Sequence, residues 1–193
     1  MDHHQTMASV LLIFLVSALS CTHQVLAATL HPAASPRNAP TTTDLISKTC
    51  AAVPFKDLCI KTLSADPDSV EADLAGLASI AIKVAMQNGT DTYNYVDQLQ
   101  KKAQYQPFTQ QCLSDCSEHY MDAVDQLEDS LAAIDAQGFN DVAIWVQAAM
   151  TDAESCEDGF KDGSGPSLLT DRNAIFNQLC SNALSIANML AKA

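Results

Sequence analysis

Residues 109–160 read TQQCLSDCSEHYMDAVDQLEDSLAAIDAQGFNDVAIWVQAAMTDAESCEDGF, and this stretch decides the fold. Apolar residues recur in it at spacings of three and four, on both sides of Gly138. Before the glycine they are Leu113, Cys116, Tyr120, Ala123, Leu127, Leu131 and Ile134, and after it Val142, Trp145, Val146, Ala149, Ala153 and Phe160. This period is typical of amphipathic helices. We therefore predict helices over about 109–136 and 141–160, with Gly138 ending the first and Asn140 as N-cap of the second.

The cysteines of this helix pair can be placed by geometry. A short turn makes two successive helices antiparallel neighbours, and residues equally far from the turn then lie level with each other. Cys116 and Cys156 satisfy this condition, and so do Cys50 and Cys59 on either side of Pro54. We therefore expect two disulfides, Cys116–Cys156 and Cys50–Cys59.

Two further cysteines do not fit a third bridge. The same level-residue argument, applied through two successive turns, relates Cys180 in the last predicted helix to the helix predicted over 109–136. Cys180 is then level with a position in that helix about 12 residues away from Cys112. At a rise of about 1.5 Å per residue that offset is roughly 18 Å, whereas bonded Cα atoms lie within about 7 Å of each other. We expect Cys112 and Cys180 to be buried thiols.

The residues outside the central stretch predict more helices. Pro54 separates two short helices, 44–53 and 55–64, because proline cannot continue a helix, and the pair should form a hairpin. A long helix is expected to begin at the N-cap Asp66 and to end at Asn88 and Gly89.

A last helix is expected to begin with Thr170 as its cap. No segment sustains the alternation that predicts a strand. We therefore predict an all-α fold over 44–193, an up-and-down four-helix bundle preceded by a short disulfide-tied helical hairpin.

The amino-terminal residues resemble a targeting segment rather than part of the bundle. An apolar run from Val10 to Leu19 has the length of a signal-peptide core and is too short to cross a membrane. We predict a signal peptide over 1–27 and a flexible, proline-containing leader over 28–43. Six cysteines remain after cleavage, which fits an oxidising compartment. A secreted, extracellular protein without a membrane span is expected.

Charge is concentrated in the central stretch. The chain has a formal net charge of −13, and between Asp115 and Asp162 it has 13 acidic residues and a single basic one, Lys161. An acidic surface disfavours nucleic acid, anionic lipid and acidic polysaccharide as partners, whereas it suits a basic protein. The alternative is a solvated face that only confers solubility.

The sequence contains few residues and no motif that are typical of a catalytic site. Beyond the predicted signal the only histidines are His31 and His119, which excludes a histidine-rich metal centre or triad, and His119 is expected on a helix surface. No nucleophile elbow or phosphate loop is present. We predict a non-enzyme without cofactor or metal. The sequon that begins at Asn88 predicts a glycosylation site there.

Several motifs together resemble a known family. They are the cysteine hairpin, LSDC at 113–116, YMDAV at 120–124 and DVAIWVQAAMTDAESCEDGF at 141–160. In this order they resemble the plant invertase and pectin methylesterase inhibitor family over 44–193. A lone cysteine in the last helix, like Cys180, is also typical of that family, whereas Cys112 is an additional one.

The resemblance implies a function. Invertase inhibitors of the family typically carry Pro-Lys-Phe in the turn that here reads Gly-Phe-Asn-Asp at 138–141. In esterase inhibitors two bundle helices lie across the enzyme's pectin-binding cleft. The positions that match those contacts are Glu118, Asp122, Asp125, Gln126, Ser155 and Asp158.

These matches favour one branch of the family. The resemblance implies a monomeric, secreted inhibitor of the apoplast that forms a 1:1 complex with pectin methylesterase and blocks its cleft. An acid invertase inhibitor and a non-inhibitory secreted helical member of the family are the alternatives. A separate inhibitor is expected, rather than the inhibitor-like pro-region of a pectinesterase.

Overall fold

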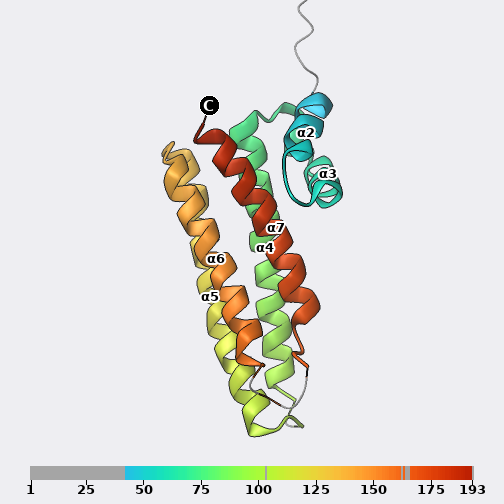
Figure 1. Ribbon diagram of the computed structural model, residues 1–193, viewed down its shortest axis with the longest axis vertical. Helices are drawn as coiled ribbons and strands as arrows, with labels where there is room; N and C mark the ends of the chain where they lie inside the picture. Colours follow the sequence, from blue (N-terminus) through green and yellow to red (C-terminus); the bar gives the residue numbers. More distant parts are fainter. Residues whose placement is uncertain (1–41, 103, 162, 164–165, 193) are drawn as a thin grey trace, which may run out of the picture. The chain divides into compact units, whose positions relative to one another are not determined.

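Four long helices contain most of the residues that the structure describes. They are α4 (Leu74–Gln100), α5 (Pro107–Asp135), α6 (Phe139–Gly159) and α7 (Thr170–Leu190). Each packs against the next one in the chain, and α7 closes the ring against α4 (Figure 1). This connectivity is that of an up-and-down four-helix bundle, so the predicted fold class is confirmed.

The computed structural model describes residues 42–102, 104–161, 163 and 166–192. Within these ranges every helix or strand assignment is helical, and no helix is long and apolar enough to cross a membrane. The predicted signal peptide over 1–27 lies outside the described residues. So does the predicted leader over 28–43, except for Thr42 and Thr43, which begin the first described helix.

A helical hairpin precedes the bundle, as predicted. It consists of α2 (Thr42–Ala51) and α3 (Lys56–Ala65), joined by the Cys50–Cys59 disulfide with a Cα–Cα distance of 5.6 Å. Both hairpin helices contact α4, and α3 also contacts α7 (Figure 1). The hairpin therefore packs on the bundle and is not an independent unit.

The long helix α4 begins later and ends later than predicted. Asp66 caps only a short 3-10 helix, η1 (Pro67–Glu71), by accepting a hydrogen bond from the Asp68 backbone at 2.9 Å. The cap of α4 is Asp73, whose carboxylate accepts the Gly76 N–H at 2.8 Å. The helix then continues through Asn88 and Gly89, so the predicted end at these residues is wrong.

Packing explains why Gly89 lies inside a helix. Gly89 is buried, and a Cβ added to it would stand 2.9 Å from Phe176 Cε2 and 3.2 Å from Val124 Cγ2. The missing side chain lets α4 approach α5 and α7 closely. The glycine is thus a packing residue and not a helix terminator.

The turn between α5 and α6 also differs from the prediction. Gln137 takes the left-handed conformation with φ 58°, and the Gly138 N–H donates to the Ala133 carbonyl at 2.8 Å, which together form a Schellman cap. Asn140 lies inside α6 and is not its cap, because the helix already begins at Phe139. The predicted Thr170 cap is wrong as well: Leu169 holds that position, and no side chain caps α7.

Helices α5 and α6 are joined by the second predicted disulfide. Cys116 and Cys156 are buried and bonded, with Cα atoms 4.7 Å apart. Closing an interval of 40 residues stabilises the fold by about 3–4 kcal/mol in the chain-entropy model. Cys112 and Cys180 are buried and belong to neither disulfide, as expected.

Candidate protein-binding face

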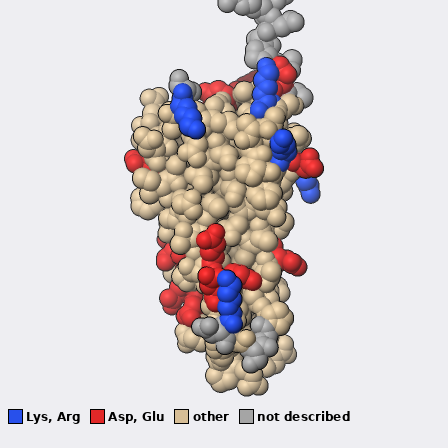
Figure 2. Space-filling model, in the orientation of Figure 1, with Lys and Arg blue, Asp and Glu red and all other residues tan. Residues whose placement is uncertain are grey.

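The outer surface of α5 and α6 is acidic. The two helices contain seven and five Asp or Glu residues respectively and no Lys or Arg. On the face that carries α6 and α7, acidic side chains gather on the half of the bundle away from the hairpin, and basic ones lie mostly near the hairpin end (Figure 2). The bundle therefore presents a negative field on one part of its surface.

The structure places all six predicted contact residues at the surface. The exposed ones are Glu118, Asp122, Asp125 and Asp158. The half-buried ones are Gln126 and Ser155. The disulfide sets the register of the two helices, since it makes Cys116 level with Cys156. The four contact residues on α5, which we call the acidic strip, extend along that helix for about 12 Å from Glu118 to Gln126. Ser155 and Asp158 on α6 lie near the Glu118 end of this strip.

A hydrogen-bonding contact between a histidine and a carboxylate across the same helix seam was not predicted. His119 Nδ1 lies 3.0 Å from Asp152 Oδ1, and their side chains are 32% and 17% exposed. Sequence reasoning assigned His119 to the helix surface without a partner. The level-residue argument that paired the cysteines would also have found this contact, because 119 and 152 are nearly equidistant from the same turn.

The basic residue of the acidic segment is already paired. Lys161 Nζ lies 2.5 Å from Asp158 Oδ1, and this hydrogen bond, with the carboxylate's charge, raises the pKa of Lys161. Asp158 is thus partly neutralised. Glu118, Asp122 and Asp125 take part in none of the ion pairs formed within the described ranges.

Below this surface a buried polar network joins three helices. The Tyr120 hydroxyl on α5 donates to Asn173 Oδ1 on α7 at 2.7 Å, and Asn173 Nδ2 donates to Glu157 Oε2 on α6 at 2.6 Å. Thr170 donates to the other oxygen of Glu157 at 2.7 Å. Burial raises the pKa of Tyr120 far above its usual value. The network, which sequence reasoning missed, holds the acidic helices in a rigid arrangement.

Two large apolar side chains interrupt the polar surface of α6. Ile144 is 62% exposed and Trp145 is 38% exposed. Sequence reasoning placed Trp145 in the apolar stripe of the core, which is wrong, because Val142 and Val146 fill the inward positions of this turn. Exposed tryptophan is enriched at the centres of protein interfaces.

Asn88 lies in the middle of α4 rather than at a helix end. The side chain is half-buried, and its Oδ1 atom is buried without a hydrogen-bond partner. The Thr90 hydroxyl of the sequon donates to the Met86 carbonyl at 3.0 Å within the same helix. Glycosylation of Asn88 stays a prediction.

The described residues do not form a metal-binding cluster. No group of three or more His, Cys, Asp or Glu side chains within 42–102, 104–161, 163 and 166–192 is arranged to hold a metal ion. The acidic residues on α5 and α6 are spread along the helices, and the nearest histidine, His119, is paired with a single carboxylate.

Known proteins share both the sequence pattern and the fold. The family model described as "Plant invertase/pectin methylesterase inhibitor" matches residues 44–186. The "Pectinesterase inhibitor" of Actinidia deliciosa is 31% identical over 147 residues, which cover 76% of this chain and 79% of that protein. The "Cell wall / vacuolar inhibitor of fructosidase 2" of Arabidopsis thaliana is 30% identical over 154 residues, covering 78% and 86%.

A solved structure agrees with the fold. A crystal structure of a mutant form of a pectin methylesterase inhibitor from Arabidopsis superposes with a TM-score of 0.64, covering 75% of this chain and 95% of that one. Its sequence identity is 21%, so this likeness concerns the fold alone.

Proposed function

Since the chain belongs to the plant invertase/pectin methylesterase inhibitor family, we propose that it is a secreted inhibitor of pectin methylesterase. In this proposal the protein acts in the cell wall as a monomer and forms a 1:1 complex with the enzyme. Helices α5 and α6 cover the pectin-binding cleft, and the inhibitor itself carries out no reaction.

The observation that carries the proposal is the acidic outer face of α5 and α6, which contains no basic residue. Pectin is an acidic polysaccharide, so a cleft that binds it suits negative charge. A rigid acidic helix pair can occupy such a cleft in place of the substrate. Glu118, Asp122 and Asp125 are exposed, and none of them belongs to an ion pair with another described residue, which suits this role.

The apolar residues on α6 support a protein partner over a purely solvated face. Ile144 and Trp145 expose large side chains beside the acidic strip. Interfaces combine such central anchors with a polar rim that excludes water. In the proposed complex these two residues supply apolar burial, and the carboxylates supply orientation and a fast encounter.

The α5–α6 turn supports the choice of target. It reads Gly-Phe-Asn-Asp at 138–141, without the lysine and proline that invertase inhibitors typically have there. Gln137 and Gly138 form a tight Schellman cap, and residues 136–141 include no Lys or Arg. A surface that lacks this lysine is a poorer match for the invertase branch.

Titration of the purified protein against one pectin methylesterase and one acid invertase tests the proposal. We expect stoichiometric inhibition of the esterase at concentrations that leave the invertase fully active. The reverse selectivity would overturn the choice of target, and inhibition of neither enzyme would support a non-inhibitory family member.

Inhibition of acid invertase is the second candidate. It is favoured by the similarity to the inhibitor of fructosidase, which at 30% identity is as close as the pectinesterase inhibitor at 31%. Identity alone therefore does not separate the two targets, and the titration decides between them.

A further inference from the structure

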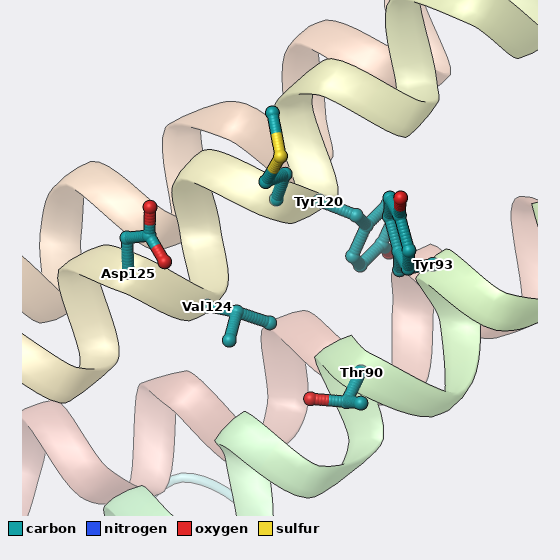
Figure 3. A pocket seen from close by; sticks show the side chains of 6 residues that line it. Thr90, Tyr93, Tyr120, Val124 and Asp125 are labelled. Atoms are coloured by element: carbon teal, nitrogen blue, oxygen red, sulfur yellow. The ribbon is translucent and has the colours of Figure 1, made fainter.

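A pocket of about 250 Å³ opens between α4 and α5, beside the acidic strip (Figure 3). Its lining residues come from two helices: Thr90 and Tyr93 on α4, and Tyr120, Met121, Val124 and Asp125 on α5. Figure 3 shows Tyr93 and Asp125 at opposite ends of this group, with Val124 between them. Sequence reasoning assigned Asp125 to the contact strip but did not find the pocket.

The walls of the pocket are mainly apolar and one end is negative. Met121 is 50% exposed and forms an accessible wall, whereas Tyr120 is fully buried, with its hydroxyl directed to Asn173. The Thr90 hydroxyl donates to its own helix, so it is not directed at a ligand. Asp125 is exposed and belongs to none of the ion pairs within the described part of the chain.

The size of the pocket argues for a single side chain as its occupant. Sites for complete small molecules usually have about 300–1,000 Å³, more than this pocket offers. Gly89 packs against Val124, which sets the register of α4 and α5 and places Tyr93 level with about Tyr120. Asp125 is then five residues further along α5, or about 7 Å from the tyrosine end.

Apolar walls that end at a free carboxylate match an amphipathic cation. Lysine and arginine bury an aliphatic stem along apolar surface and keep the charged group at the rim. At the end of the pocket away from Asp125, the Tyr93 ring offers a surface against which such a stem can lie. Elsewhere on the bundle a basic side chain does pack on a tyrosine ring, since the guanidinium carbon of Arg172 lies 4.0 Å from the centre of the Tyr95 ring.

We propose that this pocket receives a lysine or arginine side chain of the inhibited enzyme, with its stem against Tyr93, Met121 and Val124 and its charge on Asp125. The inference rests on the proposed function and extends it, because the contact surface then continues from the α5–α6 face around α5 to α4. The pocket binds one particular side chain of the enzyme, whereas the acidic strip attracts the enzyme through its electrostatic field.

Two variants test the pocket through the inhibition constant for pectin methylesterase. Asp125→Asn removes the charge and keeps the shape, and Met121→Trp fills the accessible side. Each should weaken inhibition at least roughly tenfold, since a contact of about 1.4 kcal/mol changes affinity by that factor. Matched controls are Glu71→Gln, at an exposed acid on η1 outside the acidic face, and Ile175→Trp, at a position 42% exposed on α7. The controls should change inhibition less than twofold.

A second readout does not depend on a variant. In oxidative footprinting of the free protein, Met121 should be readily oxidised because its side chain is half exposed, and it should be protected in the complex. Oxidation of Met121 at an equal rate in the free protein and the complex would overturn the proposal.

The remaining outcomes are distinguishable. Normal inhibition by both pocket variants would overturn the pocket and leave the proposed function intact. Weaker inhibition by Met121→Trp alone would mean an uncharged occupant and would contradict the basic side chain. A wild-type protein that inhibits neither pectin methylesterase nor invertase would overturn the proposed function and the pocket with it.

Discussion

At the scale of single residues, a few buried amides hold together parts of the chain that are distant in sequence. Asn182 on α7 is 4% exposed, and its side chain forms hydrogen bonds with the backbone of Phe55 at the corner of the hairpin. Its Nδ2 donates to the Phe55 carbonyl at 2.9 Å, and its Oδ1 accepts the Phe55 N–H at 3.0 Å. One side chain therefore satisfies both polar groups of one peptide residue and fixes the hairpin on the bundle.

Replacing Asn182 with alanine should loosen this attachment. Loss of two hydrogen bonds in a partly buried site should lower the free energy of unfolding by about 1–3 kcal/mol, measured by urea denaturation. Asn188→Ala is the matched control, because Asn188 is exposed on the same helix and should change stability by no more than ~0.5 kcal/mol. Equal effects of the two variants would show that the amide is not what holds the hairpin.

At the scale of the elements, the continuity of α4 depends on what packs against it. The helix has 27 residues and continues through Gly89. Judged from the neighbouring sequence alone, this glycine resembles a helix terminator. Phe176 occupies the space next to Gly89, and its ring is held edge-on by Tyr120 with ring centres 5.3 Å apart. Because this ring is fully buried, it cannot move aside at little energetic cost.

The same substitution at two helical glycines should therefore have opposite effects. Gly89→Ala gains helix propensity but forces the Phe176 ring to shift, and we expect the free energy of unfolding to fall by about 1–2 kcal/mol. At Gly159 in α6 an added Cβ meets nothing within 4 Å, so Gly159→Ala should raise stability by about 0.5–1 kcal/mol. Denaturant titration of both variants measures this difference, and stabilisation by Gly89→Ala would contradict the close packing.

At the scale of the whole bundle, the disulfides and the charge distribution act together. Cys116–Cys156 sets the register of α5 and α6, and the Tyr120–Asn173–Glu157 network ties both helices to α7. Twelve acidic residues are thereby held on two rigid neighbouring helices that contain no Lys or Arg of their own. Fixed charges lose less conformational freedom on binding than flexible ones, which favours a tight complex.

Reversing two charges on this face should affect binding and leave the fold intact. Glu118→Lys combined with Asp122→Lys should keep the helical circular dichroism and weaken esterase inhibition at least roughly tenfold, or about 1.4 kcal/mol. The loss should be smaller at high salt, where screening already weakens the contact. Glu71→Lys with Asp91→Lys makes the same change in net charge at exposed positions of η1 and α4. If both double variants inhibit like the wild type, the acidic face serves solubility only.

Sequence reasoning predicted the elements whose signals are local or symmetric. The apolar period of 109–136 and 141–160 identified the central helix pair, and the symmetry of cysteines about a turn identified both bonds, since antiparallel helices must bring equidistant residues together. Cap residues predicted the helix ends less well. Asp66, Asn140 and Thr170 are all suitable cap residues, but only Asp66 caps a helix.

The sequence alone therefore determined the helical class, the hairpin, the bundle order and the disulfide register, because periodicity and turn symmetry act within one or two neighbouring helices. Only the tertiary structure decided that α4 continues through Gly89 and that Trp145 is exposed. The same holds for the pocket between α4 and α5. Each of these features depends on which side chains of other helices fill the adjacent space, and close packing is a property of the assembled bundle that no single segment encodes.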